Sequence, residues 1–174
     1  DGYDPTKDKD MSKHIVVDFK DEARHSLFDK GLSKRIWEEL YKVIDSSDVI
    51  IYVLDARNPM GTRTFTLEEH IKKNCPNKHF LFVMNKCDLV PTGVTQKWVR
   101  YLQQFYPCVA FQASTKNPFG KGSLIQLLKQ FDGLHRNKKS ISVGFVGYPN
   151  VGKSSVINAV MGKACCKAAP IPGE

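Results

Sequence analysis

The sequence predicts an α/β fold in which helices cover a parallel sheet. Three observations lead to this prediction. Short apolar runs alternate with segments whose apolar residues recur every three or four positions. The runs at 49–54 and 80–84 contain no charged residue, as is typical of strands covered on both faces. A glycine-containing loop, residues 147–154, stands between a further apolar run and another helical pattern.

The chain begins with a polar stretch. Residues 1–30 mix acidic and basic side chains with little periodicity, which favours an extended or partner-dependent arm. From Ser33, a residue type that can cap a helix, the pattern changes to one apolar helical face that ends near residue 45. That face carries Ile36, Trp37, Leu40, Tyr41 and Ile44. We therefore divide the chain into an arm, 1–30, and one domain, 31–174.

Two strands and a short helix come next. The run 49–54 is the first predicted strand and 80–84 is the second. Between them, Thr66 and Glu69 have the spacing of a capping box, which predicts a helix that ends near Lys73. A strand–helix–strand order predicts that the two strands are parallel.

The rest of the chain repeats this alternation. A helix face over 94–105 precedes a third strand, 108–111, and a second face over 124–131 follows it. A basic linker, 132–140, leads to a fourth strand, 141–146. The first helix face carries Val94, Trp98, Tyr101, Leu102 and Phe105. The second carries Leu124, Leu127, Leu128 and Phe131. The helix after the fourth strand carries Val156, Ile157 and Val160.

Composition narrows the class of protein. With 174 residues, 41% hydrophobic and 25% charged, the chain suits one globular domain. No apolar run approaches the roughly 20 residues that a membrane-spanning helix needs. The five cysteines include no CxxC pair, so we expect reduced thiols and no zinc site.

Charge is unevenly distributed. Residues 1–48 hold 9 Lys+Arg and 12 Asp+Glu, whereas residues 49–174 hold 17 and 6, a net charge of +11. A basic domain of this kind favours a polyanionic partner, of which RNA is the leading candidate. A lysine-rich, solvated surface explains the same numbers equally well.

The loop at 147–154 matches the phosphate-binding pattern GxxxxGK[ST] and has a strand before it and a helix after it. Its residues are Gly147, Tyr148, Pro149, Asn150, Val151, Gly152, Lys153 and Ser154. Glycines allow backbone N–H groups to turn toward phosphate oxygens, and the helix that begins near Gly152 adds its dipole. We expect Lys153 to bridge the β- and γ-phosphates, Ser154 to ligate Mg²⁺, and Ser155 to hold the α-phosphate.

A second motif, NKxD, directly follows the second strand as Asn85, Lys86, Cys87 and Asp88. One carboxylate at Asp88 can accept both the N1–H and the N2 amine of guanine, a pair of donors that adenine lacks. Asn85 can bond N7 and brace the loop, and the Lys86 stem can lie over the base. Beyond the third strand, a backbone N–H at Ser114 or Thr115 can meet guanine O6. Either residue can equally belong to an ordinary loop at the end of a strand.

These motifs resemble those of GTPases, but NKxD precedes the phosphate loop here, which is the order of the circularly permuted GTPases. The segment from Asp55 to Pro59 also looks like that family, and the resemblance covers roughly residues 30–174. It implies a G domain in which the four strands present are neighbours in one partial sheet. A kinase or an ATPase would leave Asn85, Lys86 and Asp88 unexplained.

The resemblance implies a GTPase that binds GTP or GDP with Mg²⁺ and acts as an assembly or checkpoint factor for the large ribosomal subunit. It also implies placement in the nucleolus and nucleus, with the pre-ribosomal large subunit, rRNA and assembly proteins as partners. The alternative is an rRNA-binding placeholder in which GTP is structural. Nothing indicates a membrane or a homo-oligomer. Candidate RNA contacts are Lys72, Lys73, Arg136, Lys138 and Lys139, while Arg57 and Arg63 are candidates for little more than helix or RNA contacts.

The hydrolytic half of a GTPase is missing from the printed sequence. No DxxG motif follows the phosphate loop, and the segment Asp55 to Asn58 is not one because its fourth residue is Asn. We therefore interpret the chain as part of a longer GTPase and expect it to be inactive in GTP hydrolysis by itself. In potassium-stimulated GTPases an Asn at the position of Asn150 helps to hold K⁺; here Asn150 either does the same or only shapes the turn.

Overall fold

The computed structural model describes residues 32–114, 118–135 and 140–162. The chain forms two compact units, residues 1–41 and 42–174, whose boundary falls inside helix α2 (Leu32–Ser46). The predicted arm, residues 1–30, lies outside the described residues. The predicted domain limit at residue 31 therefore stays a prediction.

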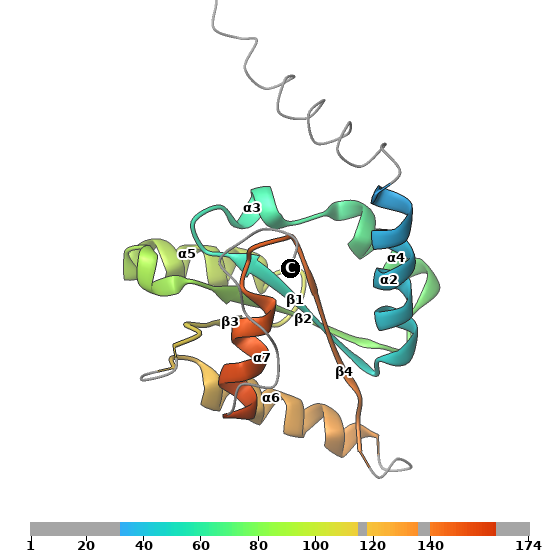
Figure 1. Cartoon of the computed structure of the whole chain (residues 1–174). Helices are drawn as coiled ribbons and strands as arrows, with labels where there is room; N and C mark the ends of the chain where they lie inside the picture. Colours follow the sequence, from blue (N-terminus) through green and yellow to red (C-terminus); the bar gives the residue numbers. More distant parts are fainter. Residues whose placement is uncertain (1–31, 115–117, 136–139, 163–174) are drawn as a thin grey trace, which may run out of the picture. The chain divides into compact units, whose positions relative to one another are not determined.

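Within the described residues of the second unit, four parallel strands form one sheet (Figure 1). They are β1 (Val49–Asp55), β2 (His79–Asn85), β3 (Cys108–Ala110) and β4 (Val143–Gly147). Their order is β3-β2-β1-β4, and every pairing is parallel. The predicted α/β class, the four strands and the contiguous partial sheet are confirmed.

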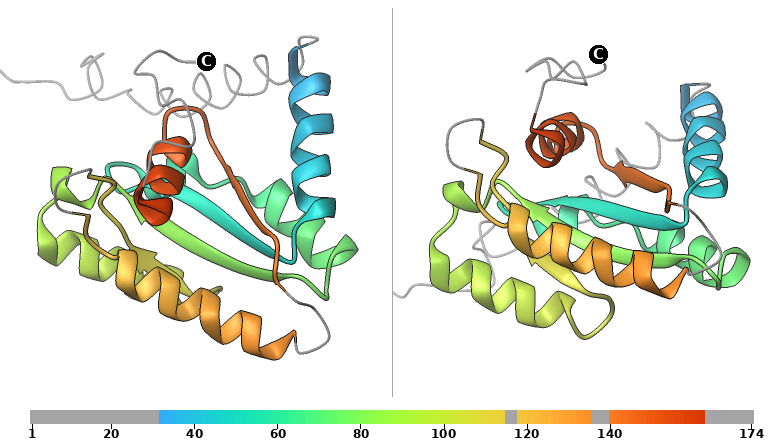
Figure 2. Two further views of the ribbon diagram at one scale, coloured as in Figure 1. Left: turned by 60° about the horizontal axis from the view of Figure 1, so that its bottom comes forward. Right: turned by 90° about the horizontal axis from the view of Figure 1, so that it is seen from below.

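Helices cover both faces of this sheet. The elements that connect or follow the strands are α3 (Pro59–Thr62), α4 (Phe65–Asn74), a 3₁₀ turn (Cys87–Leu89), α5 (Thr92–Leu102), α6 (Lys121–Leu134) and α7 (Lys153–Met161). In Figure 2, α7 lies on the face of the sheet opposite α4 and α5. Leu124 of α6 and Val156 of α7 are fully buried against β1 and β2 residues such as Val53. Alternate strand residues therefore belong to two different cores.

The core on the other face of the sheet, away from α6 and α7, is largely aromatic. Tyr52 of β1 lies within 6.0 Å, between ring centroids, of both Phe80 and Phe82 of β2. Tyr106 closes the cluster edge-on, 4.5 Å from the Phe80 centroid. Rings in these tilted arrangements contribute packing energy beyond the area that they bury. The unbroken apolar strands thus reflect burial on both sides.

The start of α4 differs from the prediction. Thr64 occupies the N-cap position and makes no side-chain capping bond, while its backbone N–H donates to the Tyr52 hydroxyl at 2.7 Å. Glu69 pairs with Lys73 at 2.8 Å. The predicted capping box of Thr66 and Glu69 is wrong because a strand residue supplies the acceptor at this helix end. Ser33 likewise lies inside α2, which begins at Leu32.

The predicted apolar face over 94–105 is only partly a core face. Leu102 is fully buried, but Val94, Tyr101 and Phe105 are 42%, 41% and 48% exposed. The Trp98 and Tyr101 rings pack edge-on at 5.9 Å. Helical spacing predicts that such residues share a face and does not decide whether the face is covered.

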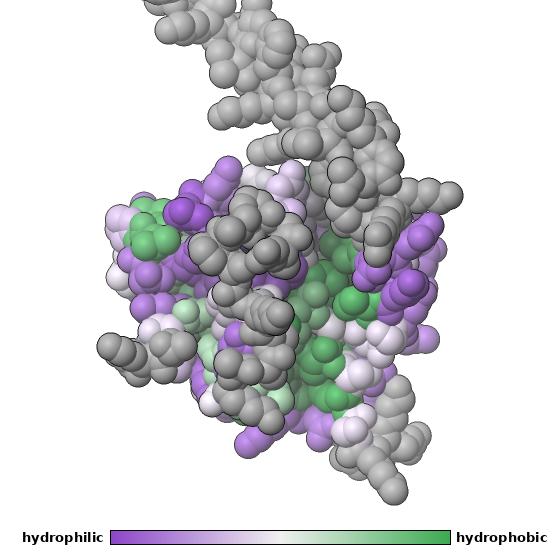
Figure 3. All heavy atoms as spheres, viewed as in Figure 1, coloured by the Kyte–Doolittle hydropathy of each residue, from purple (hydrophilic) through white to green (hydrophobic). Residues whose placement is uncertain are grey.

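The two edges of the sheet are built differently. At the β3 edge, the Gln103 side chain donates to the Cys108 carbonyl at 3.2 Å. At the β4 edge, Val143 and Phe145 are partly buried, and apolar side chains gather along the strand (Figure 3). Among the described residues, no helix is long and apolar enough to cross a membrane.

Candidate functional site

The phosphate loop connects β4 to α7, as the motif predicts. Its tip is exposed at Pro149 and Asn150, whereas Val151 is 1% exposed and belongs to the core. Asn150 (φ 64°) and Gly152 (φ 91°) adopt left-handed backbone conformations. Left-handed residues within a loop turn its N–H groups toward a common point, the geometry of an anion-binding nest. Gly147 and Tyr148 begin the loop, and Ser154 and Ser155 lie half-buried in the first turn of α7.

Lys153 is turned back on its own loop. Its ammonium donates to the carbonyls of Gly147 at 3.0 Å and Tyr148 at 2.8 Å. Burial lowers the pKa of Lys153, since desolvation disfavours the charged form. Both acceptors are neutral, and within the part of the chain that the structure describes no acidic side chain pairs with this ammonium. The loop therefore presents a half-buried cation to an entering anion.

Asn85 joins the two motifs. Its side chain is part of a residue only 2% exposed, and Nδ2 donates to the Val151 carbonyl of the phosphate loop at 2.9 Å. Its Oδ1 accepts from the Ala113 N–H at 3.2 Å. One amide thereby ties together the ends of β2 and β3 and the phosphate loop. The predicted bracing role of Asn85 is confirmed, and its contact with guanine N7 stays a prediction.

Gly152 is required by this contact. A Cβ at Gly152 would lie 2.4 Å from the Asn85 amide nitrogen, and the residue has a positive φ. Both facts exclude a side chain without local rearrangement. The second glycine of the phosphate motif therefore serves the approach of the NKxD loop.

Lys86 reaches back over the phosphate loop. Its ammonium donates to the Asn150 carbonyl at 2.6 Å and to the Asp55 carboxylate at 3.2 Å. Lys86 (φ 64°) and Asn150 (φ 64°) are the two non-glycine residues with positive φ in the described part of the chain. Strained backbone persists where surrounding contacts hold it, often at functional sites. Here the two strained residues hold each other.

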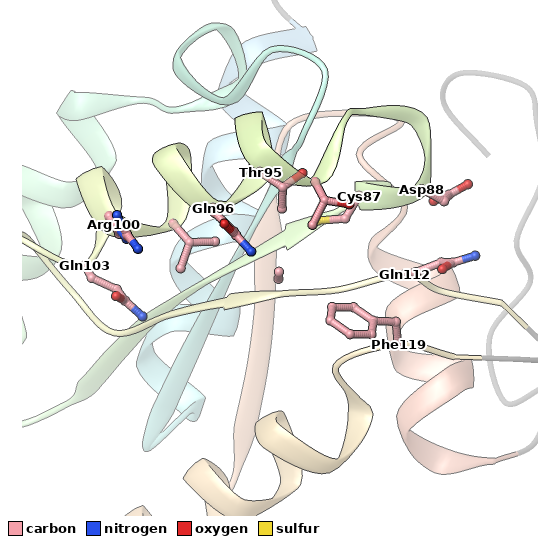
Figure 4. Close-up of a pocket in the computed structure, with 11 residues that line it drawn as sticks. Cys87, Asp88, Thr95, Gln96, Arg100, Gln103, Gln112 and Phe119 are labelled. Carbon is pink, nitrogen blue, oxygen red and sulfur yellow. The ribbon is translucent and has the colours of Figure 1, made fainter.

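The Asp88 carboxylate is exposed beyond the end of β2. It lies at one end of a cavity of about 580 Å³ between α5 and β3, which Phe119 also lines. Figure 4 shows the Asp88 and Gln112 side chains at that end, pointing outward, and Arg100 and Gln103 at the other. The Asp88 carboxylate thus points away from this cavity.

Of the two residues predicted to meet guanine O6, the structure describes Ser114. The Ser114 backbone N–H donates to the Gln112 carbonyl at 3.0 Å, which occupies that donor. Thr115 lies outside the described residues. The choice between Ser114 and Thr115 stays a prediction, and the bond to Gln112 disfavours Ser114 in this conformation.

Asp55 is a member of the site that the sequence did not reveal. It ends β1 beside Asn85, and its carboxylate accepts from Arg57 Nη2 at 2.8 Å as well as from Lys86. Burial raises the pKa of Asp55, but the bonds from Arg57 and Lys86 outweigh this effect and lower the pKa from 3.8 to about 2. The signal available in the sequence was an acidic residue that ends a strand next to the NKxD strand.

The candidate RNA contacts divide into three groups. Arg63 is 6% exposed, pairs with Glu68 at 2.6 Å and lies over the rings of Phe65 and Phe105. Of its two predicted roles, the helix contact is confirmed by the pair with Glu68 of α4, and the RNA contact is not, because the guanidinium is buried under aromatic rings. Lys72 and Lys73 are exposed. Arg136, Lys138 and Lys139 lie outside the described residues.

The described cysteines are free thiols. Burial raises the pKa of Cys108 to about 12, and burial also raises the pKa of Cys87. Thiols with a raised pKa are poor nucleophiles and poor metal ligands. The raised pKa of Cys87, at the variable position of NKxD, disfavours the thiolate form there.

Sequence comparisons agree with this geometry. The family described as 50S ribosome-binding GTPase matches residues 142–174. Nucleolar GTP-binding protein 2 of Yarrowia lipolytica is 59% identical over 172 residues, which cover 99% of this chain and 34% of the relative. The protein of the same name in Saccharomyces cerevisiae is 62% identical over 152 residues, 87% of this chain and 31% of the relative.

Two further similarities extend beyond the fungi. Nuclear/nucleolar GTPase 2 of Oryza sativa subsp. indica is 61% identical over 155 residues, 89% of this chain and 29% of the relative. Among solved structures, YjeQ from Thermotoga maritima has a TM-score of 0.45 and 26% identity over 66% of this chain and 38% of that chain. The chain spans about a third of the length of the curated relatives it matches.

Two kinds of observation agree. The chain is about 60% identical to these relatives over most of its length. It also carries both motifs, and contacts of Asn85 and Lys86 hold them together. The NKxD motif precedes the phosphate loop in the sequence, and the sheet places both at the C-terminal ends of its parallel strands, where β1, β2 and β4 end. The chain belongs to the nucleolar GTP-binding protein 2 family of circularly permuted GTPases.

Proposed function

We propose that the chain is the guanine-nucleotide-binding part of a GTPase that acts in assembly of the large ribosomal subunit. The observation that carries the proposal is the union of the two motifs. Asn85 bonds Val151 and Lys86 bonds Asn150, so the base-reading loop and the phosphate loop are held as one site. A base and a phosphate chain on the same ligand need such a fixed separation.

Each end of the site supplies a different chemistry. Asp88 would accept the two adjacent donors of guanine, with Lys86 lying along the base. Lys153 would exchange its two carbonyl partners for phosphate oxygens, which are stronger acceptors. The left-handed residues Asn150 and Gly152 fit a loop that binds an anion through backbone N–H groups.

Ser154 would ligate Mg²⁺ from the first turn of α7. A magnesium ion at this place would neutralise charge on the phosphates and orient them. A hydroxyl directly after the phosphate-loop lysine fits that role, because Mg²⁺ prefers oxygen ligands. Asn150 is a candidate to hold K⁺ nearby with its exposed side chain.

The experiment is a titration with fluorescently labelled GDP, competed by ADP and by XDP. We expect GDP to bind, ADP to fail as a competitor, and Asp88→Asn to prefer XDP by about 100-fold, because the amide pairs with xanthine instead of guanine. Asp132→Asn is the matched control. Asp132 lies in the last turn of α6, and its neighbour Phe131 stacks on His79 at the opposite end of β2. Equal competition by ADP and GDP would refute guanine recognition.

The names of the relatives support nucleolar and nuclear placement and a ribosomal partner. The second candidate function is an rRNA-bound placeholder in which nucleotide holds the fold. The net charge of +11 over residues 49–174 favours it. A Lys153→Ala protein that docks on pre-ribosomes and is still released would support the placeholder. One that docks and is retained would support a GTPase switch.

A further inference from the structure

Asp55 sits at the junction of the two motifs, although it belongs to neither. It ends β1 directly opposite Asn85 of β2, and the residue is 7% exposed. The Ala56 N–H donates to the Asn85 carbonyl at 2.9 Å, which fixes the chain just beyond Asp55. The carboxylate is therefore held at a set distance from the NKxD loop.

Two cations share this one carboxylate. Arg57 donates through Nε to Oδ1 at 3.0 Å and through Nη2 to Oδ2 at 2.8 Å. Lys86 Nζ donates to the same Oδ2 at 3.2 Å. The Arg57 side chain is 55% exposed, whereas the Asp55 and Lys86 side chains are 9% and 26% exposed. The better-shielded pair is the one with Lys86, so it is less weakened by solvent.

The ammonium of Lys86 has two anchors of different kinds. One is the neutral carbonyl of Asn150 at 2.6 Å, and the other is the charged carboxylate of Asp55. The two anchors fix the ammonium end of the Lys86 side chain, and the left-handed backbone fixes its other end. Removing the carboxylate would leave the ammonium bound to one carbonyl dipole. The stem would then lose the restraint that aligns it.

We infer that Asp55 is a positioning residue for guanine, which acts by clamping the Lys86 ammonium onto the phosphate loop so that the lysine stem presents a fixed apolar face to the base. The inference rests on the proposed guanine site. A prealigned stem spares the ligand the entropy of ordering a long side chain. The effect therefore falls on nucleotide residence time.

Asp55 also closes a turn, and the test must separate the two roles. The Arg57 N–H donates to Asp55 Oδ1 at 3.0 Å, an Asx turn that shapes residues 55–58. Asparagine keeps that acceptor and the size of the side chain, but it removes the negative charge that Lys86 faces. Asp55→Asn thus tests the clamp and leaves the turn in place.

The experiment measures dissociation of labelled GDP by stopped flow from the purified protein. We expect Asp55→Asn to speed dissociation about tenfold, since a lysine stem that is no longer aligned holds the base less tightly, and such losses of affinity appear mainly in the rate of release. Arg57→Ala is the control, because it removes the other cation from the same carboxylate and leaves Lys86 paired; its dissociation rate should stay within twofold. We expect Lys86→Met to release GDP faster than wild type by itself, and in that background Asp55→Asn should have no further effect.

Every outcome decides the question. Unchanged dissociation in folded Asp55→Asn, or an equal acceleration in the Lys86→Met background, overturns the positioning role while wild-type GDP binding leaves the proposed function intact. Loss of the folded state in Asp55→Asn also overturns it, because the charge would then belong to the fold. A wild-type protein that does not bind GDP overturns the proposed function itself.

Discussion

The two halves of the site are built on opposite principles. On the base side, Asn85 is buried and both ends of its amide bond neighbouring protein groups. On the phosphate side, the partners of the Lys153 ammonium among the described residues are two carbonyls of its own loop, those of Gly147 and Tyr148. The bracing amide of the base side has its partners before a ligand arrives, whereas the phosphate side holds a positive charge that a ligand would pair. The fold thus determines the first half, and binding energy must complete the second.

The largest expected effect comes from removing that charge. Lys153→Ala should weaken GDP binding by at least 100-fold, roughly the value of a charge-assisted contact in a shielded site. Thermal unfolding of the nucleotide-free protein should stay equal or move to higher temperature, because a half-buried ammonium, whose charged form is disfavoured by desolvation, is removed. Lys129→Ala, an exposed lysine on α6, is the control for both measurements. GDP binding within threefold of wild type would show that the phosphate loop does not depend on this cation.

Gly152→Ala should disturb both halves of the site, because Gly152 belongs to the phosphate loop and touches Asn85 of the base side. The methyl group would fall 2.4 Å from the Asn85 amide at a φ of 91°. We expect a loss of about 2–3 kcal/mol in the free energy of unfolding, from strain and a displaced hydrogen bond. Gly133→Ala on α6 is the matched control, since nothing lies within 4 Å of the added carbon. It should gain about 0.5 kcal/mol in urea unfolding, and similar destabilisation in both variants would contradict the argument.

Acid should weaken the junction between the halves. The Asp55 carboxyl has a pKa of about 2 in the folded protein, against 3.8 ordinarily. A lowered carboxyl pKa contributes stability that is full above pH 3.8 and is lost as the pH falls toward 2. Asp55→Asn should therefore be less stable at pH 7 by on the order of 1 kcal/mol and show a flatter stability curve between pH 4 and 2. Identical curves for the two proteins would remove Asp55 from the acid response.

The smallest effect concerns Asn150 at the tip of the phosphate loop. In the full-length protein we expect GTP hydrolysis to run several-fold faster in K⁺ than in Na⁺, with the difference abolished in Asn150→Gly. Glycine keeps the left-handed conformation at φ 64° and removes only the side chain. Equal rates in the two salts would assign Asn150 to the turn alone.

Much of the fold followed from local patterns. Apolar runs located all four strands, and the motif spacing located the phosphate loop between β4 and α7. Three details did not follow. The backbone N–H at the N-cap of α4 bonds Tyr52 from β1, Arg63 is buried beneath rings from α4, from β2 and from the turn after α5, and much of the α5 face is open. Each depends on residues distant in the chain, which helical or strand periodicity does not register.

The sequence by itself determined which groups are available: the glycines and lysine that can hold phosphate, the carboxylate that can read guanine, and the strands that carry them. Only the tertiary structure decided how these groups depend on one another. The C-terminal ends of parallel strands lie on the same side of the sheet, so Asp55, Asn85 and the phosphate loop meet there. They do so although 31 residues separate Asp55 from Lys86 and 66 separate Asn85 from Val151. The contacts that fix the site are made by this convergence, and no local pattern in the chain encodes it.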